Sequence, residues 1–143
     1  MFADLDYAHL EVKEDLINWG QWSSKEVDIT GIRFDAVKHF GEDFLREFIV
    51  KMDEVKEGGW FFVGEFWKDS LDDMSAYQLR MGTKFSLFDA PLVHNFSQMS
   101  NTSEDDMRTV FDGSLVQKEP INTVVSLLND HKLSPSQQPS RRL

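Results

Sequence analysis

The chain has 143 residues, of which 41% are hydrophobic, 13% aromatic and 28% charged, a composition typical of a soluble globular domain. Its 25 acidic and 15 basic residues give a net charge of −10, which opposes binding to nucleic-acid phosphates and to anionic membranes. The absence of cysteine excludes disulfides and thiol catalysis, and with neither a bilayer-spanning apolar run nor a signal peptide at residues 1–4 we expect a cytoplasmic protein.

The first half of the chain alternates amphipathic helices with short strands. Residues 11–26 and 42–56 carry apolar side chains at i, i+4 and i+7, which is the spacing of a helix with one buried face. Residues 31–35 (GIRFD) and 60–65 (WFFVGE) are rich in β-branched and aromatic residues, which favour strands. Each helix is therefore expected to cover a sheet with its apolar stripe.

The second half continues this alternation with weaker signals. Helical patterns occur at residues 70–80 and 103–111, and strand patterns at residues 84–88 (KFSLF) and 123–128 (TVVSLL). Residues 129–143 are polar and rich in proline and serine, with basic residues near the end. We expect this last segment to be a disordered tail.

The order of these elements indicates the fold class. Strands that alternate with helices over connections of this length favour right-handed crossovers and a parallel sheet. The predicted class is therefore α/β. A closed (β/α)8 barrel takes about 250 residues, whereas this chain supplies four predicted strand and helix units. Two arrangements remain open, an open sheet and a part of a barrel.

Polar side chains at the ends of the first two strands are the candidate site. Because side chains alternate along a strand, Arg33 and Asp35 share one face, and Glu65 ends the next strand. Such strand ends meet at one edge of a parallel sheet, so we expect Asp35 and Glu65 to lie beside each other. Two carboxyls suit glycosidic bond cleavage, one as nucleophile and one as acid. The structural alternative is an ordinary buried Arg33–Asp35 ion pair, with Glu65 as a solvated strand end.

Four segments resemble the motifs of one enzyme family. Residues 31–39 (GIRFDAVKH) closely resemble the fourth-strand motif of the α-amylase family of glycoside hydrolases, and residues 63–67 (VGEFW) resemble its fifth-strand motif. Residues 2–9 (FADLDYAH) and 85–92 (FSLFDAPL) are similar to flanking segments of the liquefying and fungal intracellular-type amylases. The resemblance predicts that residues 1–128 form one catalytic domain.

The resemblance implies a fold, an activity and a set of roles. The fold is a partial (β/α)8 barrel with parallel strands, and the activity is hydrolysis of α-1,4-glucans with retention of configuration. Asp35 is implied to be the nucleophile, Glu65 the proton donor, and Arg33 a neighbour of the nucleophile. Lys38 and His39 are implied to contact sugar hydroxyls on the leaving-group side.

Two further features belong to the same candidate site. Trp67 lies next to the predicted acid, where an aromatic ring could stack on a sugar. By the same resemblance, Asp4, Asp6 and the backbone carbonyl of His39 match positions that hold structural calcium. Carboxylate and carbonyl oxygens are the ligands that calcium prefers, although the remaining ligands would come from sequence ahead of residue 1.

The chain departs from the family pattern where a third carboxylate is required, at the end of the seventh strand. Residues 128–132 (LNDHK) follow the last predicted strand, and either His131 or Lys132 takes the place of the acid. Segments that match the first three strands and the eighth are also missing. We therefore expect an α-amylase-type hydrolase in the form of an incomplete barrel, inactive alone. The alternatives are a non-catalytic α-glucan-binding fragment and an open-sheet protein without a carbohydrate role.

Overall fold

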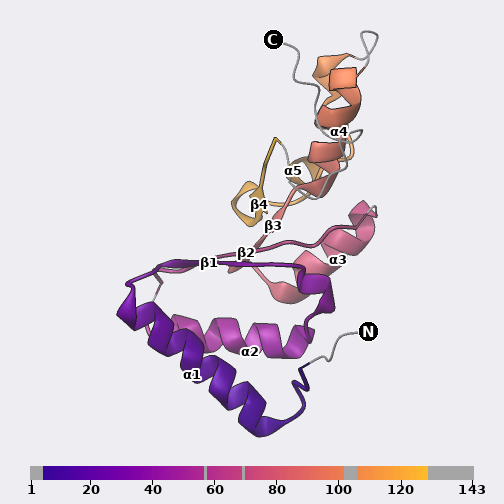
Figure 1. The fold of residues 1–143 in the computed structure, drawn as a ribbon. Coiled ribbons are helices and arrows are strands. Elements are labelled where there is room, and N and C mark those ends of the chain that lie inside the picture. The colour runs from indigo at the N-terminus through magenta and orange to yellow at the C-terminus, as the bar shows by residue number, and fades with distance from the viewer. Residues whose placement is uncertain (1–4, 57, 69, 102–105, 129–143) are drawn as a thin grey trace.

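The computed structural model describes residues 5–56, 58–68, 70–101 and 106–128 (Figure 1). Its strands are all parallel and are hydrogen-bonded in sequence order. They are β1 (Gly31–Phe34), β2 (Phe61–Gly64), β3 (Phe85–Phe88) and β4 (Val124–Val125). The predicted class and the parallel sheet are thus confirmed, although the fourth strand is much shorter than its pattern indicated.

Helix α1 precedes the first strand, and the other helices connect successive strands. The α-helices are α1 (Leu10–Glu26), α2 (Glu42–Asp53), α3 (Leu71–Met81), α4 (Ala90–Asn101) and α5 (Leu115–Lys118). Short 3-10 turns are η1 (Val37–His39), η2 (Met107–Thr109) and η3 (Ile121–Thr123). None of the helices in the described part of the chain is long and apolar enough to cross a bilayer.

The helix predicted over residues 103–111 is wrong. Residues 106–111, the described part of that range, hold only the short turn η2, and the long helix after β3 is α4. Pro91 stands in the first turn of α4, where its missing N–H would have no helical partner in any case. The side chain of Asp89 accepts the Leu92 N–H at 3.1 Å and so caps the start of α4. The helical pattern of residues 90–101 is hard to recognise in the sequence because proline usually interrupts a helix.

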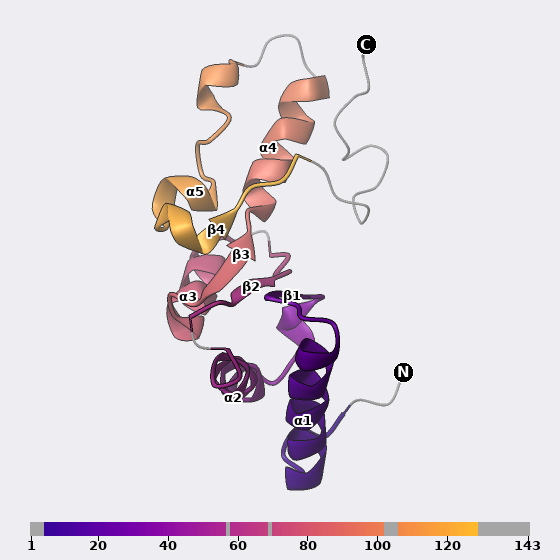
Figure 2. The same ribbon diagram turned by 90° about the vertical axis from the view of Figure 1, so that its left-hand side faces the viewer.

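The strand order distinguishes the two arrangements that the sequence left open. A doubly wound sheet reverses its strand order at a switch point, whereas these strands run from β1 to β4 without a reversal. Helices α1 and α2 lie together beneath β1 and β2 in Figure 1, and Figure 2 shows the strands stepping away from those helices toward β4. This winding is that of a barrel segment.

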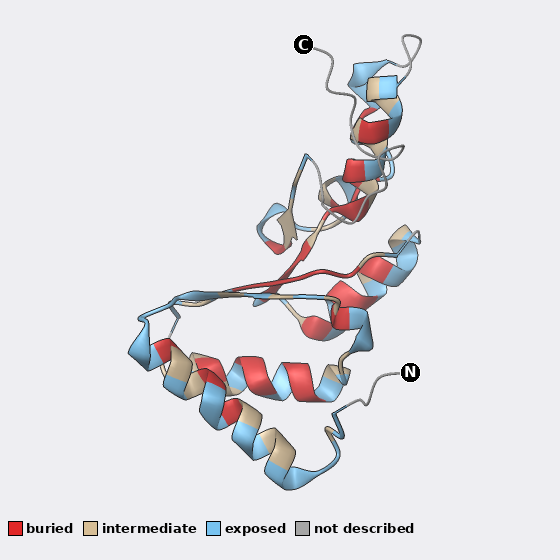
Figure 3. Cartoon of the chain, in the orientation of Figure 1, coloured by how far each residue is buried: buried red, intermediate tan, exposed pale blue. Residues whose placement is uncertain are grey.

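The core lies between one face of the sheet and the helices. Phe62, Phe85 and Leu87 point from the strands into this layer and are fully buried. Helix α2 buries one side of its surface, as the red positions along it in Figure 3 show. At the crossing of α1 and α2, a Cβ on Gly20 would stand 2.6 Å from Cζ of Phe48, so the close approach of these helices requires glycine.

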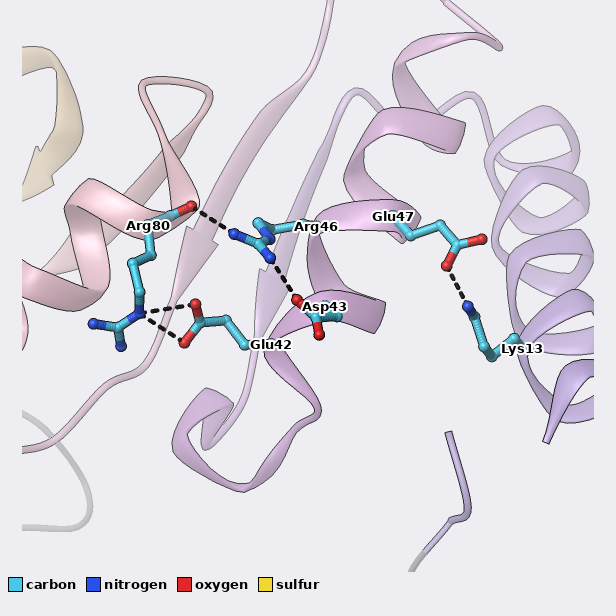
Figure 4. Close-up of polar contacts among 6 residues, drawn as sticks. All are labelled: Lys13, Glu42, Asp43, Arg46, Glu47 and Arg80. Atoms are coloured by element: carbon cyan, nitrogen blue, oxygen red, sulfur yellow. Dashed lines mark hydrogen bonds and ion pairs between the residues drawn. The ribbon is translucent and has the colours of Figure 1, made fainter. Parts of the chain in front are cut away.

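Ion pairs tie the outer side of α2 to both neighbouring helices (Figure 4). Lys13 of α1 pairs with Glu47 of α2. On the other side, Nε of Arg80 in α3 donates to both carboxylate oxygens of Glu42, at 2.9 and 3.1 Å. Arg46 reaches the backbone carbonyl of Arg80 at 3.4 Å. These contacts are at least partly exposed, so each contributes little to stability, but they link α2 to both of its neighbouring helices.

Strand β1 forms one edge of the sheet. The carbonyls of Thr30 and Phe34 accept the N–H groups of Phe61 and Glu65, and β2 is the only strand that pairs with β1 among the described residues. An apolar cavity of about 420 Å³ opens beside this edge, between α1, β1 and α2, with Trp19 and Ile32 among its lining residues. The edge position of β1 determines how exposed the candidate site is.

Candidate active site

The candidate site begins at the carboxyl end of β1. Asp35 follows the strand directly, and its side chain is 64% exposed. The next residue, Ala36, has φ 48° and ψ 45°, a left-handed conformation that costs a residue with a Cβ roughly 1 kcal/mol. This turn leads the chain from the strand into η1, and the N–H of Val37 donates to the Glu65 carbonyl at 3.0 Å. The turn therefore joins the ends of β1 and β2.

Glu65 occupies the corresponding place after β2. Its backbone N–H donates to the Phe34 carbonyl at 2.9 Å, and its carbonyl accepts the Val37 N–H. The side chain is only 1% exposed. The structural alternative, in which Glu65 is a solvated strand end, is therefore wrong.

Arg33 connects the two carboxylates. Its Nη2 donates to Oε2 of Glu65 at 2.7 Å and to Oδ1 of Asp35 at 3.1 Å. These two oxygens are thus no more than roughly 6 Å apart, since both lie within hydrogen-bond distance of one nitrogen. The structure brings Asp35 and Glu65 together as expected from the strand ends, although 30 residues separate them in sequence. Their catalytic roles stay predictions at this point.

The predicted sugar-contacting residues lie in the loops that follow β1 and β2. Lys38 and His39 lie on η1 with exposed side chains, and Nζ of Lys38 is 3.5 Å from the Trp67 carbonyl. This contact closes the gap between the loops that follow β1 and β2. Trp67 is half-buried and packs against the core, and its Nε1 is buried without a hydrogen-bond partner among the described residues. Stacking of this ring on a sugar stays a prediction.

Only part of the predicted calcium site lies within the described residues. Asp4 lies outside the described residues, and Oδ1 of exposed Asp6 accepts the Ala8 N–H at 3.0 Å. Within the described ranges, no group of three or more His, Asp or Glu side chains is placed to hold a metal ion. One carboxylate and the His39 carbonyl are too few for the six to eight oxygens that calcium takes. The calcium site therefore stays a prediction.

The predicted disordered tail and the expected place of the third carboxylate stay predictions. Residues 129–143, which include His131 and Lys132, lie outside the described residues.

Sequence reasoning missed two residues of this region, Phe88 at the end of β3 and Asp89 directly after it. The ring of Phe88 lies 5.9 Å from Cζ of Arg33, and the fully buried carboxylate of Asp89 accepts the N–H groups of Leu92, Leu115 and Val116. Asp89 thus caps both α4 and α5. The alternation of side chains along residues 84–88 could have placed Phe88 on the face of Arg33, but the role of Asp89 depends on α5, 26 residues away.

Comparison with known proteins relates this site to a family. No protein-family model matches the chain. A glucan 1,4-α-maltohexaosidase from Bacillus sp. (strain 707) is 35% identical over 138 residues, which cover 96% of this chain and 26% of that protein. An α-amylase from Bacillus licheniformis and the cytoplasmic α-amylase of Escherichia coli (strain K12) are each 33% identical over 96% of this chain, and the match covers 27% and 28% of their lengths.

Solved structures agree with this relationship. An Anoxybacillus α-amylase superposes with a TM-score of 0.70 at 28% identity, over 78% of this chain and 24% of that structure. An α-amylase from Geobacillus thermoleovorans in complex with acarbose gives a TM-score of 0.65 at 31% identity, over 76% and 24%. These matches confirm the predicted barrel segment. The chain spans about a quarter of the length of the curated relatives it matches, and over nearly all of its own length it belongs to the α-amylase family.

Proposed function

We propose that the chain supplies the nucleophile and the proton donor of a retaining hydrolase of α-1,4-glucans. The observation that carries this proposal is the single nitrogen of Arg33 that bonds both Asp35 and Glu65. Retaining glycosidases hold their two carboxyl groups about 5–5.5 Å apart, whereas inverting enzymes leave about 6.5–9.5 Å for a water molecule. The two oxygens that Arg33 bridges lie at most roughly 6 Å apart, which supports the shorter separation.

The proposed roles rest on the exposure of Asp35 and on the resemblance of residues 31–39 and 63–67 to the α-amylase motifs. Asp35 is open to an incoming sugar, so its oxygen attacks the anomeric carbon and forms a glycosyl ester. Glu65 donates a proton to the departing glycosidic oxygen, and the bond between that oxygen and the anomeric carbon breaks. Glu65 then takes a proton from a water molecule, whose oxygen displaces Asp35 and restores the original configuration. Arg33 holds both carboxyls in register during these steps.

An α-glucan is the proposed partner. Lys38 and His39 are exposed at the same rim as Asp35, where their donors can meet the hydroxyl groups of a sugar bound on the leaving-group side. The relative from Geobacillus thermoleovorans was solved in complex with acarbose, which supports a carbohydrate ligand for this chain. A cytoplasmic location is part of the proposal and is supported by the Escherichia coli relative, whose name states it.

The test measures hydrolysis and binding separately. The purified chain is incubated with maltohexaose, release of reducing ends is followed, and proton NMR records the anomer formed first. The missing third acid predicts an inactive chain, but because the structure brings Asp35 and Glu65 together we expect slow release, with the α-anomer first. We expect loss of release in Asp35→Asn and in Glu65→Gln, and no change in Asp43→Asn, which alters an exposed carboxylate on α2. Calorimetric titration with maltohexaose is run on all four proteins.

The outcomes discriminate between the candidate functions. Release that persists in both Asp35→Asn and Glu65→Gln would overturn the assigned roles. Binding of maltohexaose without release by the unaltered chain would instead support a non-catalytic α-glucan-binding fragment. Absence of both binding and release would refute a carbohydrate function for the chain.

A further inference from the structure

We propose that Phe88 is a positioning residue that holds the Arg33 guanidinium where it bridges the two carboxylates. The catalytic meaning of this inference rests on the proposed function, but the placement of Arg33 does not. The inference adds the third strand to a site whose other members come from β1 and β2.

The register of the sheet places Phe88 in the row of the carboxylates. Arg33 of β1 stands level with Val63 of β2, which in turn stands level with Ser86 of β3. Two residues further along each strand, on the same face, come Asp35, Glu65 and Phe88. The ring therefore ends the row that the two carboxyl groups begin.

The contact between the ring and Arg33 is suited to restrain a cation. Cζ of Arg33 lies 5.9 Å from the centroid of the Phe88 ring, within the range in which a guanidinium is attracted to an aromatic face. The Arg33 side chain is 45% exposed and has many rotamers available in water. A flat ring beside it removes part of that freedom and favours the rotamer in which Nη2 reaches both carboxylates.

The backbone next to Phe88 is held in place by hydrogen bonds of Asp89. Phe88 is half-buried at the end of β3, and the next residue, Asp89, is fully buried. The N–H of Asp89 donates to the Val125 carbonyl at 2.9 Å, and its carboxylate accepts backbone N–H groups at the starts of α4 and α5. Phe88 is thus fixed by β4 and by two helices, none of which contributes a carboxylate to the site.

Three variants test the inference. Phe88→Leu removes the aromatic face and keeps an apolar side chain, whereas Phe88→Tyr keeps the ring. Phe61→Leu is the matched control, because Phe61 lies on the same face of β2 but at its amino end, level with Gly31. Thermal melts monitored by circular dichroism ensure that the variants compared are folded.

The first readout is independent of any reaction. The Nε–Hε signal of Arg33, assigned by its loss in Arg33→Lys, reports side-chain mobility through its heteronuclear NOE. In Phe88→Leu we expect the ordered population of Arg33 to fall about 2- to 5-fold, the strength of an exposed cation–π contact. Phe88→Tyr and Phe61→Leu are expected to retain the signal of the unaltered chain.

The second readout is hydrolysis of maltohexaose. We expect Phe88→Leu to lower kcat about 2- to 5-fold with little change in KM. Phe88→Tyr, which keeps the ring, is expected to have the kcat of the unaltered chain. An unchanged Arg33 signal in Phe88→Leu, or an equal change in Phe61→Leu, would overturn the inference. If Arg33 becomes mobile in Phe88→Leu while even the unaltered chain releases no sugar, the positioning role stands and the proposed function fails.

Discussion

The contact between Arg33 and Glu65 gives the sharpest prediction about stability. Oε2 of Glu65 accepts from Nη2 of Arg33 at 2.7 Å, and the Glu65 side chain is 1% exposed whereas that of Arg33 is 45% exposed. Replacing Arg33 by Ala removes this cation from beside the buried carboxylate. A hydrogen bond to a charged group contributes about 1.5–3 kcal/mol, and weaker compensation of the buried charge adds to the loss. Because water can enter where Arg33 stood, we expect a decrease of about 2–3 kcal/mol in the free energy of unfolding.

The double variant provides the critical comparison. Glu65→Gln alone keeps the shape of the side chain and one acceptor for Arg33, so we expect a loss of about 1 kcal/mol. In Arg33→Ala combined with Glu65→Gln no charge is left buried, so the double variant should be more stable than Arg33→Ala by about 0.5–1 kcal/mol. The resulting coupling free energy is about 1.5–2 kcal/mol.

Urea denaturation at pH 7, followed by tryptophan fluorescence, measures the four free energies. The exposed pair of Arg46 and Asp43 on α2 (Figure 4) is the matched control, and its coupling should stay within about 0.5 kcal/mol. Raising the salt concentration should weaken the coupling of the control pair further and have less effect on the Arg33–Glu65 pair, whose carboxylate is buried. A double variant no more stable than Arg33→Ala would refute the reasoning.

Three further outcomes are expected. Gly64→Ala should lower the free energy of unfolding in urea by about 2–3 kcal/mol, because its Cβ would stand 2.4 Å from Cζ of fully buried Phe85; a loss below 0.5 kcal/mol would contradict it. Asp89→Asn should cost about 2 kcal/mol in the same assay, because an amide cannot accept at both oxygens of a carboxylate that caps two helices, whereas an unchanged midpoint would show that the caps are dispensable. Burial raises the pKa of Tyr77 to about 12, so the stability that its neutral form provides is complete below about pH 10 and is lost as the pH rises through 12; alkaline unfolding that is identical in Tyr77→Phe would disprove this.

Most of the fold could be predicted from short-range patterns. The residue types and periodicity of residues 31–35 fit only a strand, and those of residues 42–56 fit only a helix. Both elements occur where they are expected. Helix α4 could not be predicted in this way, because its start is marked by Pro91, which reads as a breaker, and by the cap from Asp89. Whether a proline begins or interrupts a helix depends on the backbone around it.

The candidate site divides in the same way. The rule that functional side chains gather at the carboxyl ends of parallel strands was enough to associate Asp35 with Glu65. The bridge between them was not predictable, because it depends on one rotamer of Arg33. The contact with Phe88 depends in addition on the register of β2 with β3, which the alternation of side chains constrains but does not determine.

The contrast in exposure between the two carboxyls follows from the order of the strands. Asp35 ends the edge strand β1, where no second strand flanks it among the described residues, and its side chain is 64% exposed. Glu65 ends β2, which is flanked by β1 and β3, and its side chain is almost fully buried. The proposed nucleophile therefore lies at the open edge, and the proposed proton donor lies between two strands. Any partner or segment that pairs with the edge of β1 that no described strand occupies would bury Asp35 as well, so access of a sugar to the proposed nucleophile depends on what occupies that edge.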